Sequence, residues 1–326
     1  MKELNTKGGT NRFKYSSFND IIAGISIDVS HVIKKSKLQE EFYFKQGLIK
    51  WKELNASTDF KDFLKEINNY QSLVQLIHHQ KEIVDILLKH LGKSGSLAVE
   101  PLLWLCVDLA KDLVQDFFPF YLDFLKAFAD LLKSTQDPHL IQSIFTSIAW
   151  LFKINAKSLV KDIIPTFDVL FHLFNSKDYI QGFTAESFGF LVRKLDIVQL
   201  RTLFSKMQEN LKDKEEHLVH GFGLFIIESI KHVQGNLHSK GLDILKEFYM
   251  VFSKNRLIME HVAGLAQKSL SNEALSEVFR SLVDEILLHS TNDCYSICSM
   301  FSSATILLLY RNGRYLKGIC FNVNYR

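Results

Sequence analysis

The sequence repeats itself at an interval of about forty residues. Residues 137–153 resemble residues 178–194 at a shift of about forty, and within them Ser-Ile-Ala-Trp-Leu at 147–151 matches Ser-Phe-Gly-Phe-Leu at 187–191. The stretches that precede these segments match at nearly the same shift. Between the matched segments, apolar residues recur with the spacing of one face of an α-helix. The pattern therefore predicts a series of similar helical units.

Units of this length built from two helices are characteristic of HEAT and armadillo repeats, in which each unit packs only on its neighbours. We therefore expect an all-α protein, an α-solenoid of HEAT-like or armadillo-like helical repeats. Of its 326 residues 47% are apolar, and only four are Pro and 15 Gly. This composition favours long buried helices over a sandwich or a barrel. Such a protein acts through the surface that it presents.

The helical array is not expected to occupy the whole chain. Residues 1–15 are polar and contain glycine, and we expect them to be disordered. Residues 16–290 are predicted to form the repeats, with breaks at Asp, Asn and Gly that cap the helices or turn the chain. In residues 291–326 no Asp or Glu follows Asp293, and three of the four cysteines lie there. We interpret this end as a divergent tail that arises from truncation or alternative splicing.

Four residues of the array carry sharper structural predictions. Asn155 is expected to break a helix. Pro165 stands in an apolar pattern that runs over 159–176 and is expected to bend that helix, the alternative being that it starts a new short one. Trp150 and Phe190 hold equivalent positions in the repeat, and we expect both to be buried between helices.

The sequence contains no pattern that indicates catalysis. It lacks the glycine-rich loops that bind nucleotides, and none of its histidines lies in the His-Glu-x-x-His pattern of zinc hydrolases. Cys294, Cys298 and Cys320 are of the type that binds zinc, but their spacing is loose and leaves the fourth ligand undefined. We predict that the protein is not an enzyme, needs no cofactor or metal and has no small-molecule substrate. Apolar runs are too short to cross a membrane.

Any contact with nucleic acid must be local, because the net charge is only +3. The basic residues that could contact RNA or protein are Lys34, Lys35, Lys37, Lys50, Lys52, Arg193 and Lys194. The cluster at 34–37 is the strongest nucleic-acid candidate, because it is compact and expected in a loop. For each group the alternative is an ordinary solvated helix face or a charge at a helix C-terminus.

Four segments resemble a known family. They are residues 47–55 (Gly-Leu-Ile-Lys-Trp-Lys-Glu-Leu-Asn), 101–103 (Pro-Leu-Leu), 116–119 (Asp-Phe-Phe-Pro) and 183–194 (Phe-Thr-Ala-Glu-Ser-Phe-Gly-Phe-Leu-Val-Arg-Lys). The family is the very large HEAT-repeat component of the small-subunit processome, also called DRIM or down-regulated in metastasis. The chain resembles an N-terminal fragment of it over residues 12 to 288, most specifically in 185–194.

The resemblance implies a non-catalytic scaffold of ribosome biogenesis. Members of the family act in the nucleolus, within the nucleus, where they contact preribosome proteins and pre-ribosomal RNA, directly or indirectly, during rRNA processing. We therefore expect processome proteins and pre-ribosomal RNA as partners. Periodicity by itself allows an alternative, a generic HEAT-repeat adaptor such as a transport receptor or the regulatory arm of a kinase or phosphatase.

Overall fold

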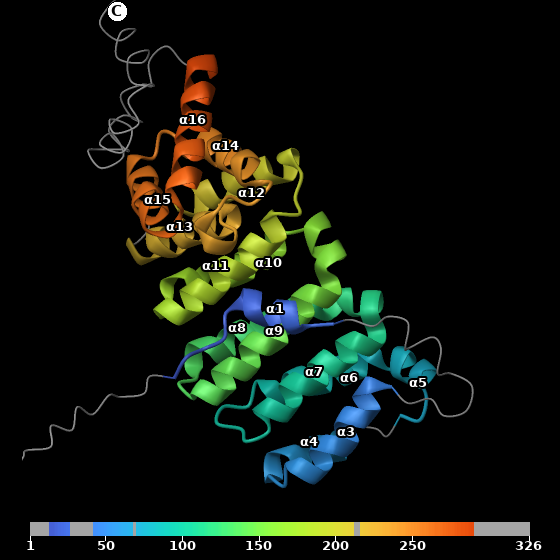
Figure 1. Ribbon diagram of the computed structural model, residues 1–326. Helices are drawn as coiled ribbons and strands as arrows, with labels where there is room; N and C mark the ends of the chain where they lie inside the picture. The colour runs from blue at the N-terminus through green and yellow to red at the C-terminus, as the bar shows by residue number, and fades with distance from the viewer. Residues whose placement is uncertain (1–12, 27–41, 68–69, 212–215, 290–326) are drawn as a thin grey trace, which may run out of the picture. The chain divides into compact units, whose positions relative to one another are not determined.

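The computed structural model describes residues 13–26, 42–67, 70–211 and 216–289 (Figure 1). These residues are mainly helical and form no strand, apart from one isolated antiparallel bridge between Lys231 and Leu237. The fold is all-α, and neighbouring helices pack as in a helical repeat. The chain forms two compact units, Met1–Ser187 and Phe188–Arg326, and the boundary between them lies within the helix Asp178–Val192.

The first unit contains two rows of helices. Its helices are α1 (Phe18–Gly24), α3 (Tyr43–Leu54), α4 (Thr58–Glu66), α5 (Leu73–His78), α6 (Gln80–Leu91), α7 (Val99–Leu113), the 3-10 helix η1 (Val114–Phe120), α8 (Tyr121–Ser134), α9 (Pro138–Lys161), α10 (Ile164–Leu170), the 3-10 helix η2 (Phe171–Asn175) and the first half of α11 (Asp178–Val192). In one row α6 packs on α8 and α8 on α10, and in the other α3 packs on α7 and α7 on α9. This is the arrangement of paired helices in a repeat stack.

The second unit continues the same plan. It holds the end of α11, then α12 (Ile197–Asn210), α13 (Glu216–Ile230), the 3-10 helix η3 (Val233–Gly235), α14 (Gly241–Phe252), α15 (Arg256–Ser269) and α16 (Asn272–His289). Helix α14 packs between α12 and α16, while α13 packs on α15. Aromatic rings fill the space between the rows: Phe204 lies 6.1 Å from Phe248, and Phe222 lies 5.0 Å from Phe252.

Helix starts follow the predicted breaks at Asp and Asn. The carboxylate of Asp137 accepts a hydrogen bond from the amide of His139 at 3.0 Å, and Asp196 forms a reciprocal capping box with Gln199. Asn255 caps α15 in the same way. Each side chain satisfies an amide that would otherwise lack a partner in the first turn, so these short polar residues fix where each helix begins.

Burial confirms the register of the repeat and corrects one expectation drawn from it. Residues 147–149 and 151 are buried and Trp150 is half-buried, and the same sequence of burial recurs at 187–191 with Phe190 half-buried. Both aromatic rings thus face out of the core, and the prediction that they are buried is wrong. The ammonium group of Lys111 lies 4.4 Å from the Trp150 ring, and that of Lys194 lies 4.5 Å from the Phe190 ring. Cation–π contact stabilises rings at such partly exposed positions.

Helix α9 is longer than predicted, and Pro165 does not bend it. The amide nitrogen of the Asn155 side chain donates to the carbonyl of Leu151 at 2.9 Å, so this buried polar group is satisfied within the helix and does not end it. The helix continues to Lys161, and Pro165 stands in the first turn of α10. Proline is tolerated there because its missing amide would have no helical partner. The alternative, a new short helix, is therefore correct.

The segment from Phe13 to Ile25 packs against α9 and the first half of α11 (Figure 1). Tyr15 stacks on Tyr179 at 4.4 Å, and Phe18 is fully buried against Phe152 and Phe183, at 5.6 and 5.5 Å. The rest of the predicted disordered N-terminus, and the predicted tail at 291–326, lie outside the described residues. Within the described ones, aromatic contacts fix the segment from Phe13 to Ile25 on α9 and α11.

Helix α3 is capped by a side chain from α7. Its first residues lack a capping side chain of their own, and the buried carboxylate of Asp112 accepts hydrogen bonds from the amides of Tyr43 at 2.9 Å and Phe44 at 2.8 Å. At the other end of α3, the side chain of Asn55 donates to the carbonyl of Leu97 at 3.0 Å. These contacts fix α3 antiparallel to α7. Burial raises the pKa of Asp112 to about 7, although the two amides act to lower it.

The Asp112 cap should make the stability of the first unit depend on pH. In the unfolded chain the carboxyl ionises near its ordinary pKa of about 4, whereas in the fold it keeps its proton until about pH 7. Folding therefore takes up a proton between these values, and the stability that this group contributes decreases as the pH rises through the window. We expect Asp112→Asn to reduce this slope, which is at most about 1.4 kcal/mol per pH unit. Urea unfolding at several pH values checks it, and equal slopes in both proteins would contradict the buried cap.

Candidate interaction surface

One face of α9 carries a row of lysines. The helix is 24 residues long and contains Lys153, Lys157 and Lys161 but no Asp or Glu. A spacing of four residues keeps the three side chains on one face, with a rise of about 6 Å from each to the next. Lys157 and Lys161 are exposed and Lys153 is half-exposed. No described residue forms an ion pair with any of the three.

An aromatic ring extends this row. Trp150 lies one turn before Lys153 on the same face, and Lys111 of the parallel helix α7 lies over it. Lys111 also bonds to Asp108 at 3.0 Å and lies 5.3 Å from the ring of Tyr43 on α3. We call the four residues Trp150, Lys153, Lys157 and Lys161 the α9 stripe. It combines a partly exposed indole ring with three cations that form no ion pair with a described residue.

Asp108 of α7, which bonds to Lys111, is already engaged. Burial raises the pKa of Asp108, while Lys111 and, less strongly, Lys50 act to lower it. The Asp108 carboxylate thus interacts chiefly with the ammonium group one turn further along its own helix. The positive charge of Lys153, Lys157 and Lys161 is therefore not offset by this acid.

The candidate residues from the sequence do not all share one role. Lys34, Lys35 and Lys37 lie outside the described residues. Lys50 and Lys52 are exposed on α3 in the first unit, and the ammonium of Lys50 lies 5.3 Å from the ring of Trp51. Lys194, at the end of α11 in the second unit, is exposed apart from its contact with Phe190. These three remain available to a partner.

Arg193 closes the end of a neighbouring helix. Its guanidinium donates to the carbonyl of Glu228 at 3.0 Å and to that of Lys231 at 3.3 Å, in and just after the last turn of α13. Such carbonyls have no partner within their helix, and a cation there also interacts favourably with the helix dipole. The structure therefore gives Arg193 a stabilising contact that the sequence did not indicate.

Arg193→Ala should destabilise the second unit by about 1–2 kcal/mol, because two helix-end carbonyls lose a charged donor. The matched variant is Lys194→Ala, whose exposed side chain lies against Phe190 of the same helix and which should cost less than about 0.5 kcal/mol. Thermal unfolding of both variants measures the difference. If Lys194→Ala were the more destabilising of the two, the capping role assigned to Arg193 would be incorrect.

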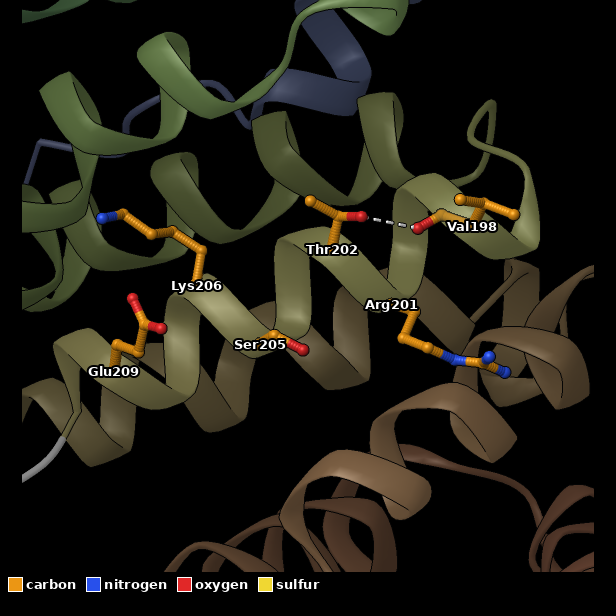
Figure 2. A pocket seen from close by; sticks show the side chains of 6 residues that line it. All are labelled: Val198, Arg201, Thr202, Ser205, Lys206 and Glu209. Carbon is orange, nitrogen blue, oxygen red and sulfur yellow. Dashed lines mark hydrogen bonds between the residues drawn. The ribbon is translucent and has the colours of Figure 1, made fainter.

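A shallow recess of about 470 Å³ runs along α12 (Figure 2). Its lining comes from one face of that helix: Val198, Arg201, Thr202, Ser205, Lys206 and Glu209. The hydroxyl of Thr202 donates to the carbonyl of Val198 at 2.9 Å. The guanidinium of Arg201 forms a bidentate salt bridge with the carboxylate of Glu247 on α14, with hydrogen bonds of 2.9 and 3.0 Å. Arg201 therefore joins α12 to α14, while Thr202 bonds within its own helix, and the recess is a polar helix surface with these two groups already bonded.

Two histidines that are distant in sequence meet in the second unit. Nδ1 of His220 on α13 lies 2.9 Å from Nε2 of His261 on α15, and the missing Cβ of Gly223 leaves room for the His261 ring. His261 lies 41 residues after His220, about one repeat away, so no local pattern in the sequence indicates this contact. In the described part of the chain, His, Cys, Asp and Glu side chains form no group of three that could hold a metal ion. None of the described helices could span a membrane.

Neighbouring helices that pack in this order define a helical-repeat protein. No family model matches the chain. Over 253 residues it is 31% identical to U3 small nucleolar RNA-associated protein 20 of Saccharomyces cerevisiae, a region that covers 75% of the chain and 10% of that protein. The protein of the same name in Schizosaccharomyces pombe is 27% identical over 260 residues, covering 77% of the chain and 10% of the relative.

The chain is thus homologous to U3 small nucleolar RNA-associated protein 20, which confirms the family resemblance found in the sequence. It spans about a tenth of the length of these curated relatives.

Proposed function

We propose that this protein is a non-catalytic scaffold in small-subunit processome assembly and in the maturation of small-subunit ribosomal RNA. The observation that carries the proposal is the homology over three quarters of the chain to a protein named for its association with U3 small nucleolar RNA. On this proposal the protein works in the nucleolus and contacts processome proteins and pre-ribosomal RNA.

The fold suits such a role. Each unit has a continuous core of Phe, Leu and Ile side chains that holds its helices in a fixed order. A stack of this kind presents a broad surface of fixed shape, along which partners can be held by shape and by local charge. The exposed lysines of α3 and α9 provide that charge in the first unit, and Lys194 provides it in the second.

The test is a tagged pull-down of the full 326-residue chain from nuclear extract at moderate salt, with both RNA and protein identified. We expect small-subunit precursor RNA and processome proteins to be recovered above the level of an unrelated helical-repeat protein of similar charge. Recovery of nuclear pore proteins or of phosphatase subunits instead would favour the generic adaptor. Recovery of none of these would contradict the scaffold role.

A further inference from the structure

We propose that the α9 stripe binds single-stranded RNA, with its lysines on successive backbone phosphates and the indole ring of Trp150 stacked against a base. This inference rests on the proposed function and names the part of the first unit that would contact RNA. The residues of the α9 stripe were not among the candidate contact residues named from the sequence.

The charge of the stripe is regular, and none of its lysines forms an ion pair with a described residue. One lysine per helical turn over Lys153, Lys157 and Lys161 forms a straight row of cations about 12 Å long. The acid that follows the row, Asp162, lies outside the helix at its C-cap position. A chain of phosphates is a linear and regularly charged ligand, and lysines that neutralise it release condensed counterions, which drives binding.

The aromatic ring distinguishes RNA from a general polyanion. A partly exposed ring beside a row of cations is the arrangement by which proteins hold single strands without reading sequence, because every base can stack on a ring. Lys111 lies over the Trp150 ring, but its ammonium also bonds to Asp108. On this proposal a base that stacks on the ring displaces the Lys111 ammonium from it, and the bond to Asp108 continues to hold that ammonium. An acidic protein segment would gain nothing comparable from the ring.

The experiment measures binding of a labelled oligouridylate to the full chain over a series of salt concentrations. The triple variant Lys153→Ala, Lys157→Ala and Lys161→Ala should bind at least about tenfold more weakly at low salt, with a salt slope smaller by about 2 because three single-strand phosphate contacts are lost. The control variant Lys61→Ala, Lys81→Ala and Lys126→Ala removes the same charge from exposed positions on α4, α6 and α8. It should change the affinity less than about twofold, since surface charges away from the site act only through screened long-range forces.

Trp150→Leu tests stacking separately from charge. It should weaken binding by about fivefold or more while leaving the salt slope unchanged, because stacking releases no counterions. In the unaltered protein, RNA should quench part of the tryptophan fluorescence, and this quenching should be lost in Trp150→Leu although Trp51 and Trp104 remain. Circular dichroism establishes that each variant is folded before its affinity is compared.

The outcomes separate the stripe from the scaffold role. Equal affinities of the stripe and control variants for oligouridylate would overturn the proposal that the α9 stripe binds RNA. So would tighter binding of polyglutamate than of RNA, which would identify the face as a site for an acidic protein. If the unaltered chain recovers processome proteins from extract yet binds no oligouridylate, the scaffold role stands and the stripe is wrong. If it binds oligouridylate through the stripe but recovers no processome component, the stripe stands and the proposed function is wrong.

Discussion

Phe152→Ala should reduce the stability of the first unit by about 3–5 kcal/mol, the range for removing a large aromatic side chain from a packed core. Phe152 is fully buried. Its ring meets Phe18 of α1 at 5.6 Å and Tyr121 at the start of α8 at 6.4 Å, so it joins three parts of the chain. A cavity here cannot be closed by one side chain moving, because three separate helices form its walls. The expected decrease in the midpoint of thermal unfolding is about 10 °C.

The matched control lies two residues away on the same helix. Trp150 is larger than Phe152 but is half-buried, and its ring faces Lys111 and not the core. Trp150→Ala should therefore cost less than half as much as Phe152→Ala, since much of the ring is already in contact with water in the folded protein. A cost equal to or above that of Phe152→Ala would mean that the register of the repeat is displaced.

Local patterns in the sequence predicted most of the fold, because helical repeats depend on contacts between neighbours. The forty-residue period, and Asp or Asn at the helix starts, are properties of short segments, and they gave the correct register and the correct breaks at Asp137, Asp196 and Asn255. The wrong predictions concern positions where the burial of a side chain, or the end of a helix, depends on which group the side chain contacts. Apolar spacing cannot distinguish an aromatic ring in the core from one covered by a lysine, as at Trp150. Nor does it show that Asn155 bonds to its own helix and so lets α9 continue.

The candidate site was harder to predict, because its contacts join distant parts of the chain. Asp112 caps a helix that begins 69 residues earlier, and Arg193 bonds to a carbonyl 35 residues later. No local pattern indicates either contact. The lysines of α9 did leave a signal, since they are spaced one turn apart in a helix without an acid. The sequence analysis preferred Lys34 to Lys37, because those lysines are close together in the sequence. It could not show that α7 packs beside α9 and brings Lys111 to Trp150.

Gly189→Val should destabilise the second unit by about 3 kcal/mol, at the upper end of the cost of overpacking. A Cβ at Gly189 would lie 3.0 Å from both the carbonyl carbon and oxygen of Glu228, and 3.2 Å from the amide nitrogen of Ser229. These are backbone atoms of α13, so relief requires the two helices to separate. Ala149, at the equivalent position of α9, is also small and fully buried, which indicates that the repeat brings helices close together at this point.

Gly182→Ala is the control for Gly189→Val because it lies two turns earlier in the same helix and a Cβ there would meet no atom within 4 Å. It should stabilise the protein by about 0.5–1 kcal/mol, since alanine has the higher helix propensity. Opposite signs for the two substitutions would show that glycine is required at 189 by the approach of α13 and not by the helix itself. Thermal unfolding gives the signs, and hydrogen exchange of residues 188–230 locates the loss. If Gly189→Val were neutral or stabilising, the close packing of α11 on α13 would be incorrect.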